Sequence, residues 1–174
     1  MILFIAGTNA FAQEAGGSQF GAVYGLSVPD ADNTNAHKLF GAKGSAFLKP
    51  TFSIGGYYFV ADNDQGTGGR EFDYSLSGLE TTFHMPAGTG DTFFGIRFGL
   101  TKVKTDFSGE EVILSPYHYG IVAGYDYLMA PWLAIGFEGS YLYVEDSNTT
   151  KNSIRYDEDT FSTIHFLVTL QLRL

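Results

Sequence analysis

Apolar residues recur at every second position along most of this chain, beginning near residue 18. Phe20, Tyr24 and Leu26 occupy one set of alternate positions, and Gln19 and Ser27 occupy the other. Successive side chains of a β-strand point to opposite faces, so this period predicts strands with one apolar and one polar face. The pattern returns in segment after segment, which predicts an all-β fold.

Eight segments carry the alternation, and we expect strands over residues 18–28, 40–48, 51–60, 72–83, 94–101, 117–127, 133–143 and 163–174. In the fourth segment the apolar set of positions changes at Ser77 and Gly78, which predicts a β-bulge at Gly78. An even number of such segments is typical of an antiparallel up-and-down barrel.

The connections between these segments alternate in length. Three are short turns, at residues 49–50, 86–91 and 130–131. Four are longer and polar, at residues 29–38, 61–70, 104–111 and 145–159. Short turns at one end and long loops at the other are the pattern of barrels that span an outer membrane. No apolar run reaches about 18 residues, so no membrane-spanning helix is expected.

The polar face indicates which side of the barrel meets water. It consists mainly of Gly, Ser and Thr, and its charged residues near the strand centres are Lys43, Glu80, Arg97 and Glu138. A water-facing exterior would carry many more Lys and Glu, whereas small residues suit the narrow interior of an eight-stranded barrel. The chain is only 17% charged. The apolar face is therefore expected to meet lipid.

Aromatic residues support the same orientation. Tyr125, Tyr127, Trp132, Tyr141 and Tyr143 lie near strand ends, where the aromatic girdle of a membrane protein is found. The sequence therefore predicts an eight-stranded antiparallel up-and-down transmembrane β-barrel, formed by residues 13–174 as a single domain.

The first twelve residues have a different pattern from the rest of the chain. They are apolar and end in Ala10-Phe11-Ala12, an A-x-A cleavage pattern that precedes Gln13. We expect residues 1–12 to be the remnant of a secretory signal peptide, and a buried first strand is the alternative. The chain has no Cys, which is compatible with export to the periplasm or the outer membrane.

Two neighbouring segments resemble a known family. The segments 120–127 and 133–143 are similar to the last strand pairs of the small OmpA/OmpX-like outer-membrane barrels, and residues 161–174 resemble their C-terminal assembly signal. That signal usually ends in an aromatic residue, whereas this chain ends in Leu174. The resemblance implies a bacterial outer-membrane protein whose lumen holds a salt-bridge network that plugs the barrel or gates a small pore. We expect both termini in the periplasm.

The four inward charges are the strongest candidate site. Lys43, Glu80, Arg97 and Glu138 are expected to pair, because an isolated buried charge is very costly. The favoured interpretation is a network that fills and orders the lumen. A gate that exchanges partners is the alternative.

Histidines give a weaker signal. His118 and His165 share the inward set of positions, and we expect hydrogen-bonded lumen groups there; their spacing does not demand a metal. His37 is placed in the first long loop, and with Asp73 and Ser75 it is a faint candidate for the site of a lipid A-modifying enzyme. We expect no catalytic residue, no metal and no cofactor.

The net charge of −9 argues against a nucleic-acid partner, whose phosphates bind Lys and Arg. Acidic residues concentrate in the long loops, and the candidates for contacts there are Asp62, Asp64, Glu110, Glu111, Asp157, Glu158 and Asp159. They would bridge divalent cations to lipopolysaccharide phosphates or contact an extracellular partner, and surface solubility is the simpler interpretation.

These observations predict a monomeric outer-membrane barrel with a structural or surface-interaction role, in contact with outer-membrane lipid and lipopolysaccharide, and without enzymatic activity. The alternative function is a narrow porin or small-solute channel that resembles the OmpW-type barrels. Such a channel would need a continuous lumen or an opening in the wall, for which Gly55, Gly56 and Gly78 are the candidate positions.

Overall fold

The computed structural model describes residues 16–30, 36–62, 72–107, 110–145, 147–151, 154–158 and 160–174. Their strands are β1 (Ser18–Pro29), β2 (His37–Lys49), β3 (Phe52–Asp62), β4 (Phe72–Ala87), β5 (Gly90–Phe107), β6 (Glu110–Leu114), β7 (Tyr117–Ala130), β8 (Leu133–Val144), β9 (Ser147–Lys151), β10 (Ile154–Glu158) and β11 (Phe161–Arg173). Within these ranges no helix is present that is long and apolar enough to cross a membrane. The expected signal-peptide remnant at 1–12 lies outside the described residues.

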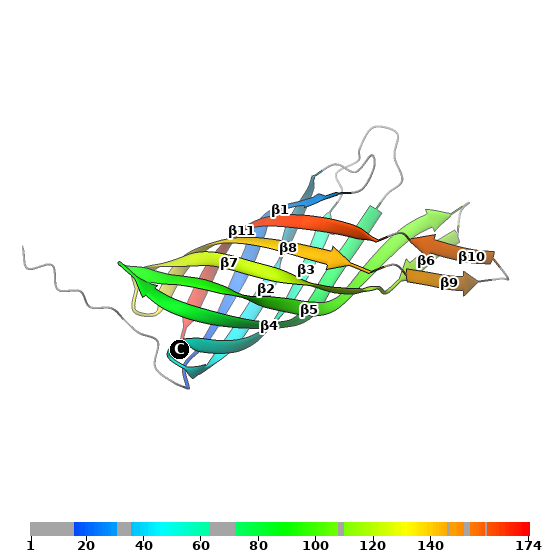
Figure 1. Cartoon of the computed structure of the whole chain (residues 1–174). Coiled ribbons are helices and arrows are strands. Elements are labelled where there is room, and N and C mark those ends of the chain that lie inside the picture. Colours follow the sequence, from blue (N-terminus) through cyan, green and yellow to red (C-terminus); the bar gives the residue numbers. More distant parts are fainter. Residues whose placement is uncertain are drawn as a thin grey trace, which may run out of the picture.

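Eight of the strands close into an antiparallel barrel (Figure 1). The order around the barrel is β4-β3-β2-β1-β11-β8-β7-β5, and pairing between β4 and β5 completes the circle. The first and last strands pair continuously from Gln19–Arg173 to Pro29–Thr163. Each barrel strand therefore has two hydrogen-bonded neighbours, which satisfies the backbone of a chain that crosses lipid. The predicted eight-stranded transmembrane barrel is confirmed.

The two ends of the barrel differ. At the short-turn end lie the turns at 50–51, 88–89 and 131–132 together with the C-terminus (Figure 1). At the opposite, long-loop end, β5 continues beyond the barrel and pairs with β6, and β9 pairs with β10. The predicted loops over 104–111 and 145–159 are thus largely hairpins. Val103, Val112 and Ile154 are β-branched residues of the kind that favour strands even in a polar segment.

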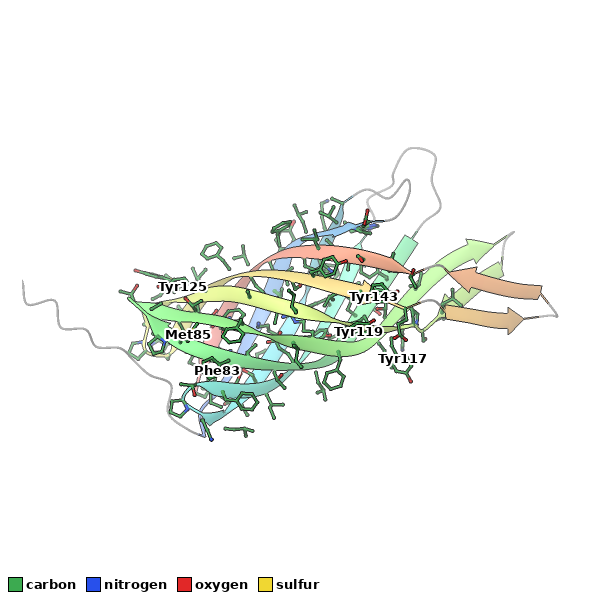
Figure 2. All side chains as sticks on the ribbon, viewed as in Figure 1. Phe83, Met85, Tyr117, Tyr119, Tyr125 and Tyr143 are labelled. Atoms are coloured by element: carbon green, nitrogen blue, oxygen red, sulfur yellow. The ribbon has the colours of Figure 1, made fainter. Side chains whose placement is uncertain are left out.

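The outer surface of the barrel is apolar. Ile121, Phe137 and Phe166, near the middle of their strands, are 62%, 57% and 60% exposed, whereas the next residues, Val122, Glu138 and Leu167, point inward and are buried. Figure 2 shows apolar side chains projecting outward around the wall. An apolar surface that encircles the barrel in this way is the lipid-facing band of a transmembrane barrel.

Aromatic residues lie toward both ends of this band. Tyr117, Tyr119 and Tyr143 lie toward the long-loop end, and Tyr125 lies toward the short-turn end (Figure 2). The rings of Tyr119 and Tyr143 are 5.3 Å apart, and the Tyr125 hydroxyl donates to the Ala87 carbonyl at 3.0 Å. These phenols lie where a membrane protein places side chains that have an apolar body and a polar tip.

Strand β4 has no bulge at Gly78, so that prediction is wrong. β4 pairs with β3 and with β5 through this residue without a shift of register. The apolar set of positions changes because Tyr74 and Leu76 point into the barrel, whereas Leu79 and Phe83 point outward. Tyr74 and Leu76 belong to a cluster of buried apolar side chains inside the barrel, so the apolar positions of β4 face inward before Gly78 and outward after it.

A charge in the middle of the outer surface should destabilise the barrel. We expect Phe137→Arg to lower the free energy of unfolding in phospholipid vesicles by about 2–4 kcal/mol, because the guanidinium would lie in hydrocarbon. Glu145→Arg is the matched control, since Glu145 is exposed directly after the same strand. It should change the free energy of unfolding by at most about 1 kcal/mol. Equal effects in a urea titration would contradict a lipid-facing Phe137.

Candidate functional site

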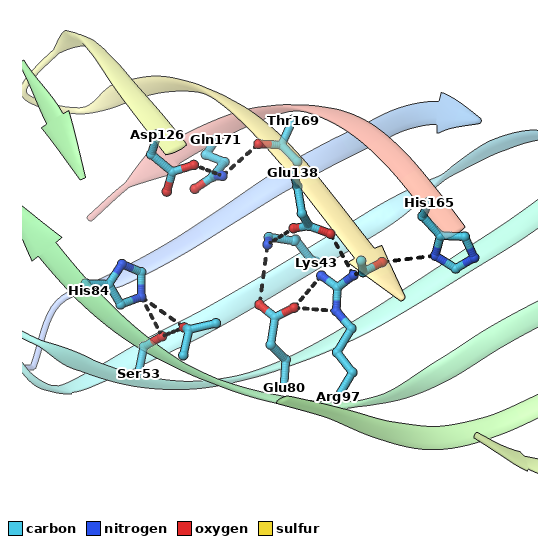
Figure 3. Close-up of polar contacts among 12 residues, drawn as sticks. Lys43, Ser53, Glu80, His84, Arg97, Asp126, Glu138, His165, Thr169 and Gln171 are labelled. Carbon is cyan, nitrogen blue, oxygen red and sulfur yellow. Dashed lines mark hydrogen bonds and ion pairs between the residues drawn. The ribbon is translucent and has the colours of Figure 1, made fainter. Parts of the chain in front are cut away.

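The centre of the lumen holds the four charged residues that the alternation places inside. Lys43 comes from β2, Glu80 from β4, Arg97 from β5 and Glu138 from β8 (Figure 3). All four are buried, with at most 7% of any of them exposed. Strands from different parts of the wall thus direct two cations and two carboxylates to one point. We call these residues the central charge cluster.

Each cation of the central charge cluster contacts both carboxylates. Lys43 Nζ lies 3.3 Å from Glu80 Oε1 and 2.6 Å from Glu138 Oε2. Arg97 Nε donates to Glu80 Oε2 at 2.5 Å, and Arg97 Nη2 also pairs with this oxygen. Arg97 Nη1 lies 2.6 Å from Glu138 Oε1. The formal charges cancel, which is the condition under which buried charges are tolerated.

Aromatic rings cover Arg97 on the side of the long-loop end. The guanidinium carbon lies 5.0 Å from the centre of the Tyr57 ring and 5.4 Å from that of Phe59. Such cation–π contacts stabilise a cation that has lost its water. The Tyr57 hydroxyl is hydrogen-bonded to His118 Nε2 at 2.5 Å, and Thr101 Oγ1 contacts His118 Nδ1 at 2.9 Å.

A second hydrogen-bonded path leaves the cluster through Ser140. Arg97 Nη1 donates to Ser140 Oγ at 3.3 Å, and Ser140 Oγ lies 3.3 Å from His165 Nδ1 (Figure 3). The structure therefore places both His118 and His165 in the lumen with polar partners. No group of three or more His, Asp or Glu residues in the described parts of the chain is arranged to hold a metal ion.

An apolar cluster includes the rings of Tyr57 and Phe59 and extends from them toward the long-loop end. Its members are buried side chains from β1 to β6, β8 and β11: Val23, Leu39, Tyr57, Phe59, Ala61, Tyr74, Leu76, Val103, Leu114, Leu142 and Leu167. The alternation predicts a lumen of small and polar residues and gives no indication of this cluster. Its signal is present in the runs 57–60 and 166–168, where both faces of a strand are apolar. We call these residues the apolar plug.

His37 also lies inside the barrel, which contradicts its predicted place in a loop. It begins β2, is 2% exposed, and its ring meets that of Tyr74 edge-on at 5.6 Å. Pairing of His37 with Ser27 of β1 extends the strand to this residue. Ser75 lies between the inward Tyr74 and Leu76 and so points outward. His37 and Ser75 are on opposite faces of the wall and do not form a catalytic pair, and the side chain of Asp73 is outside the described set.

A second charged group lies at the short-turn end, and the sequence analysis did not single it out. Arg173 Nη1 lies 3.0 Å from Asp91 Oδ2, and its Nη2 lies 3.4 Å from Asp126 Oδ2. Gln171 Nε2 donates to Asp126 Oδ1 at 2.9 Å and to Thr169 Oγ1 at 2.7 Å (Figure 3). Asp91, Asp126, Gln171 and Arg173 belong to the inward-facing set of alternate positions, as the central charge cluster does. This pattern in the sequence could have identified them.

The space between these two charged groups is very small. It is lined by Lys43 and Glu80 of the central charge cluster and by residues closer to the short-turn end, among them Gln19, Ser45 and Gln171, and it does not admit a water-sized sphere. Side chains thus fill the described lumen in successive layers: the short-turn charges, the central charge cluster and the apolar plug. An eight-stranded barrel is just wide enough for such filling.

The wall is closed at the glycines that were candidates for an opening. Gly55 and Gly56 of β3 pair with both β2 and β4, and Gly78 pairs with Tyr57 and Gly99 on its two sides. Gly78 instead leaves room for the side chain of Tyr57 and the backbone of β5. A Cβ atom there would lie 2.8 Å from the Tyr57 hydroxyl oxygen and 2.2 Å from the Phe98 carbonyl oxygen.

The acidic candidates of the long loops are only partly placed. Glu110 and Glu111 lie in β6, Asp157 and Glu158 lie in β10, and Asp62 ends β3. The structure describes the backbone of these residues and not their side chains. Asp64 and Asp159 lie outside the described residues.

A closed eight-stranded wall, a lipid-facing apolar surface and a lumen filled by side chains together define a small outer-membrane β-barrel. No family model matches the chain, and no curated protein matches it. Neisserial surface protein A is similar in structure, with a TM-score of 0.71 and 13% identity over 90% of this chain and 95% of that chain.

Two further solved structures have the same fold. Ail, the attachment invasion locus protein of Yersinia pestis, gives a TM-score of 0.62 at 14% identity over 92% of this chain and 99% of its own. OprG from Pseudomonas aeruginosa gives 0.62 at 8% identity over 94% and 98%. At these identities the likeness shows a shared architecture, that of small bacterial outer-membrane barrels.

Gly78 provides a direct test of lumen packing. We expect Gly78→Ala to lower the free energy of unfolding by about 1–3 kcal/mol, because the added methyl group overpacks the space against Tyr57 and the β5 backbone. Gly56→Ala is the control, since a Cβ there would meet nothing closer than the Gly78 carbonyl oxygen at 3.5 Å. It should change stability by less than about 0.5 kcal/mol. Equal destabilisation by both substitutions in urea titrations would contradict this account.

Proposed function

We propose that the protein resides in the bacterial outer membrane as a non-conducting barrel and acts through the hairpins at its long-loop end. The observation that carries this proposal is the double closure of the lumen, by the central charge cluster and by the apolar plug. The alternative of a narrow porin or small-solute channel needs a continuous path, and the described lumen is filled.

The two closures oppose an ion by different means. In the central charge cluster each charged group already has an opposite charge within 3.3 Å, so a passing ion would have to displace an existing pair. In the apolar plug, Leu39, Leu76 and Leu142 are fully buried, and the hydroxyls of Tyr57 and Tyr74 are already hydrogen-bonded, to His118 and to Ser27. Removing the ion's water there would be very costly.

The hairpins at the long-loop end support a role at the cell surface. β5 with β6, and β9 with β10, extend beyond the barrel at the long-loop end (Figure 1). In the proposed orientation both termini and the short turns face the periplasm, and the hairpins face the outside. Their short strands present backbone edges of the kind that bind partners by adding a strand.

The charge of the chain favours a cationic or protein partner on this side. The strands of these hairpins hold the carboxylates Glu110, Glu111, Asp157 and Glu158 beside the cations Lys151 and Arg155, and the net charge of the chain is −9. One structure of Ail holds the heparin analogue sucrose octasulfate, a polyanion. Such a soluble polyanion would meet the carboxylates of the hairpins, where like charges would be brought together.

The proposed role requires no catalysis, and we propose that the barrel acts as a monomer without enzymatic activity. Support comes from His37 and Ser75, which lie on opposite faces of the wall. The number of acyl chains on lipid A should therefore be the same in cells with and without the protein.

Single-channel recording tests the double closure. The refolded wild-type protein should give no discrete conductance steps in planar bilayers. Arg97→Ala should also be silent, because the apolar plug still closes the lumen. A variant that combines Arg97→Ala with Leu39→Ala and Phe59→Ala removes groups from both layers, and this variant should conduct.

Each variant is first checked for folding by the mobility difference between boiled and unboiled samples on a gel. Discrete steps from the wild type would contradict the proposal and favour the channel. Steps from Arg97→Ala alone would show that the apolar plug is no barrier and that the central charge cluster acts as the gate.

A further inference from the structure

A polar patch interrupts the outer surface near the long-loop end, between β4 and β5. Ser75 and Ser77 of β4 and Lys102 of β5 point outward, because the residues beside them, Tyr74, Leu76, Thr101 and Val103, are buried inside the barrel. We call Ser75, Ser77 and Lys102 the outer polar patch.

The outer polar patch lies at the edge of the lipid-facing band. The outward residues of β5 before it are Phe94, Ile96, Phe98 and Leu100, which are 40–57% exposed. Lys102 is the next outward position, about 7 Å further along the strand at the usual rise of a β-strand. This is where hydrocarbon gives way to lipid headgroups, and the long stem of a lysine carries its ammonium toward that boundary.

Pairing of the strands brings the members of the patch together. Lys102 lies directly opposite Ser75, and Leu100 lies between Ser77 on β4 and Tyr117 on β7. Directly opposed residues have Cβ atoms about 4.5–5.5 Å apart. Tyr117 is 65% exposed and projects outward, as Figure 2 shows. One ammonium and the hydroxyl groups thus share a small area of the outer wall.

The donors of this patch are not used elsewhere in the described structure. Lys102 is exposed and has no ion-pair partner among the described side chains, in contrast to the inward Lys43. A cation with hydroxyl donors at the headgroup level is complementary to a phosphate group.

We infer that the outer polar patch binds a phosphate group of a lipid in the outer leaflet, with Lys102 as the charged donor. The inference rests on the proposed outer-membrane location and adds a specific lipid contact to it. In such a membrane the phosphorylated outer-leaflet lipid is lipopolysaccharide, so the phosphates of lipid A are the ligand to test. The contact lies on the outside of the barrel and is independent of the acidic loops.

The test titrates bis-phosphorylated lipid A into the refolded protein in a phosphocholine detergent and counts bound lipid by native mass spectrometry. Lys102→Gln should weaken binding about tenfold, as expected for the loss of one charge-assisted hydrogen bond. Lys102→Arg should retain the affinity. Lys49→Gln is the matched control, because Lys49 is an exposed cation at the short-turn end, and it should bind as the wild type does.

Two further probes identify the source of the phosphate. Dephosphorylated lipid A should bind the wild type as weakly as lipid A binds Lys102→Gln. Inorganic phosphate should not displace the lipid; displacement would overturn the inference in favour of a site for a soluble anion. An equal loss of affinity in Lys102→Gln and Lys49→Gln would also overturn it, because it would show attraction by net charge alone.

Folding and insertion separate this inference from the proposed function. If the wild type fails to insert into phospholipid vesicles, the outer-membrane location is wrong and the inference falls with it. If the wild type inserts and Lys102→Gln binds lipid A with unchanged affinity, the inference alone is wrong.

Discussion

Four charges meet inside the barrel in a place where water has almost no room, and the rest of the structure has to accommodate them. Lys43, Glu80, Arg97 and Glu138 belong to four different strands, and each contact among them joins two strands that are not hydrogen-bonded neighbours, apart from Glu80 and Arg97. A shift of any of these strands by one residue would turn its charge outward to lipid. The cluster therefore stabilises one register over the alternatives, and this specificity is its main contribution.

The other layers of the lumen follow from this constraint. Arg97 reaches the middle of the barrel beneath the rings of Tyr57 and Phe59, and Tyr57 fits because Gly78 has no side chain. From the rings toward the long-loop end the buried side chains are mostly apolar, and at the opposite end Arg173 pairs with two carboxylates. The lumen is thus closed by charge pairing, by aromatic stacking and by apolar packing in turn. That sequence of layers closes the lumen, and this is why we propose that the protein acts through its outer surface and its hairpins.

Much of the fold could be predicted from the sequence because alternation reports the difference between the two faces of a strand. It correctly indicated the eight strands, and it placed Lys43 and Arg97 inside. It failed where both faces are apolar. Tyr74 and Leu76 look like lipid-facing residues in the sequence, so their inward position was read as a bulge at Gly78.

Long-range contacts explain the remaining errors. His37 belongs to β2 because Ser27 of β1 pairs with it, and no local pattern in the sequence predicts that pairing. The β5–β6 hairpin was read as a loop because its composition is polar, although its strands pair in register. The short-turn charges around Arg173 were visible as inward positions, and only the closure of the barrel brings them to Asp91 and Asp126.

The buried charges hold the barrel strands in register through their mutual pairing. A double-mutant cycle between Arg97→Met and Glu138→Met, measured by urea unfolding in phospholipid vesicles, tests it most directly. The account predicts a coupling energy of about 1–3 kcal/mol, whereas Arg97→Met and the distant Lys49→Met should be additive within about 0.5 kcal/mol. Additive effects of Arg97→Met and Glu138→Met, within the same limit, would contradict it.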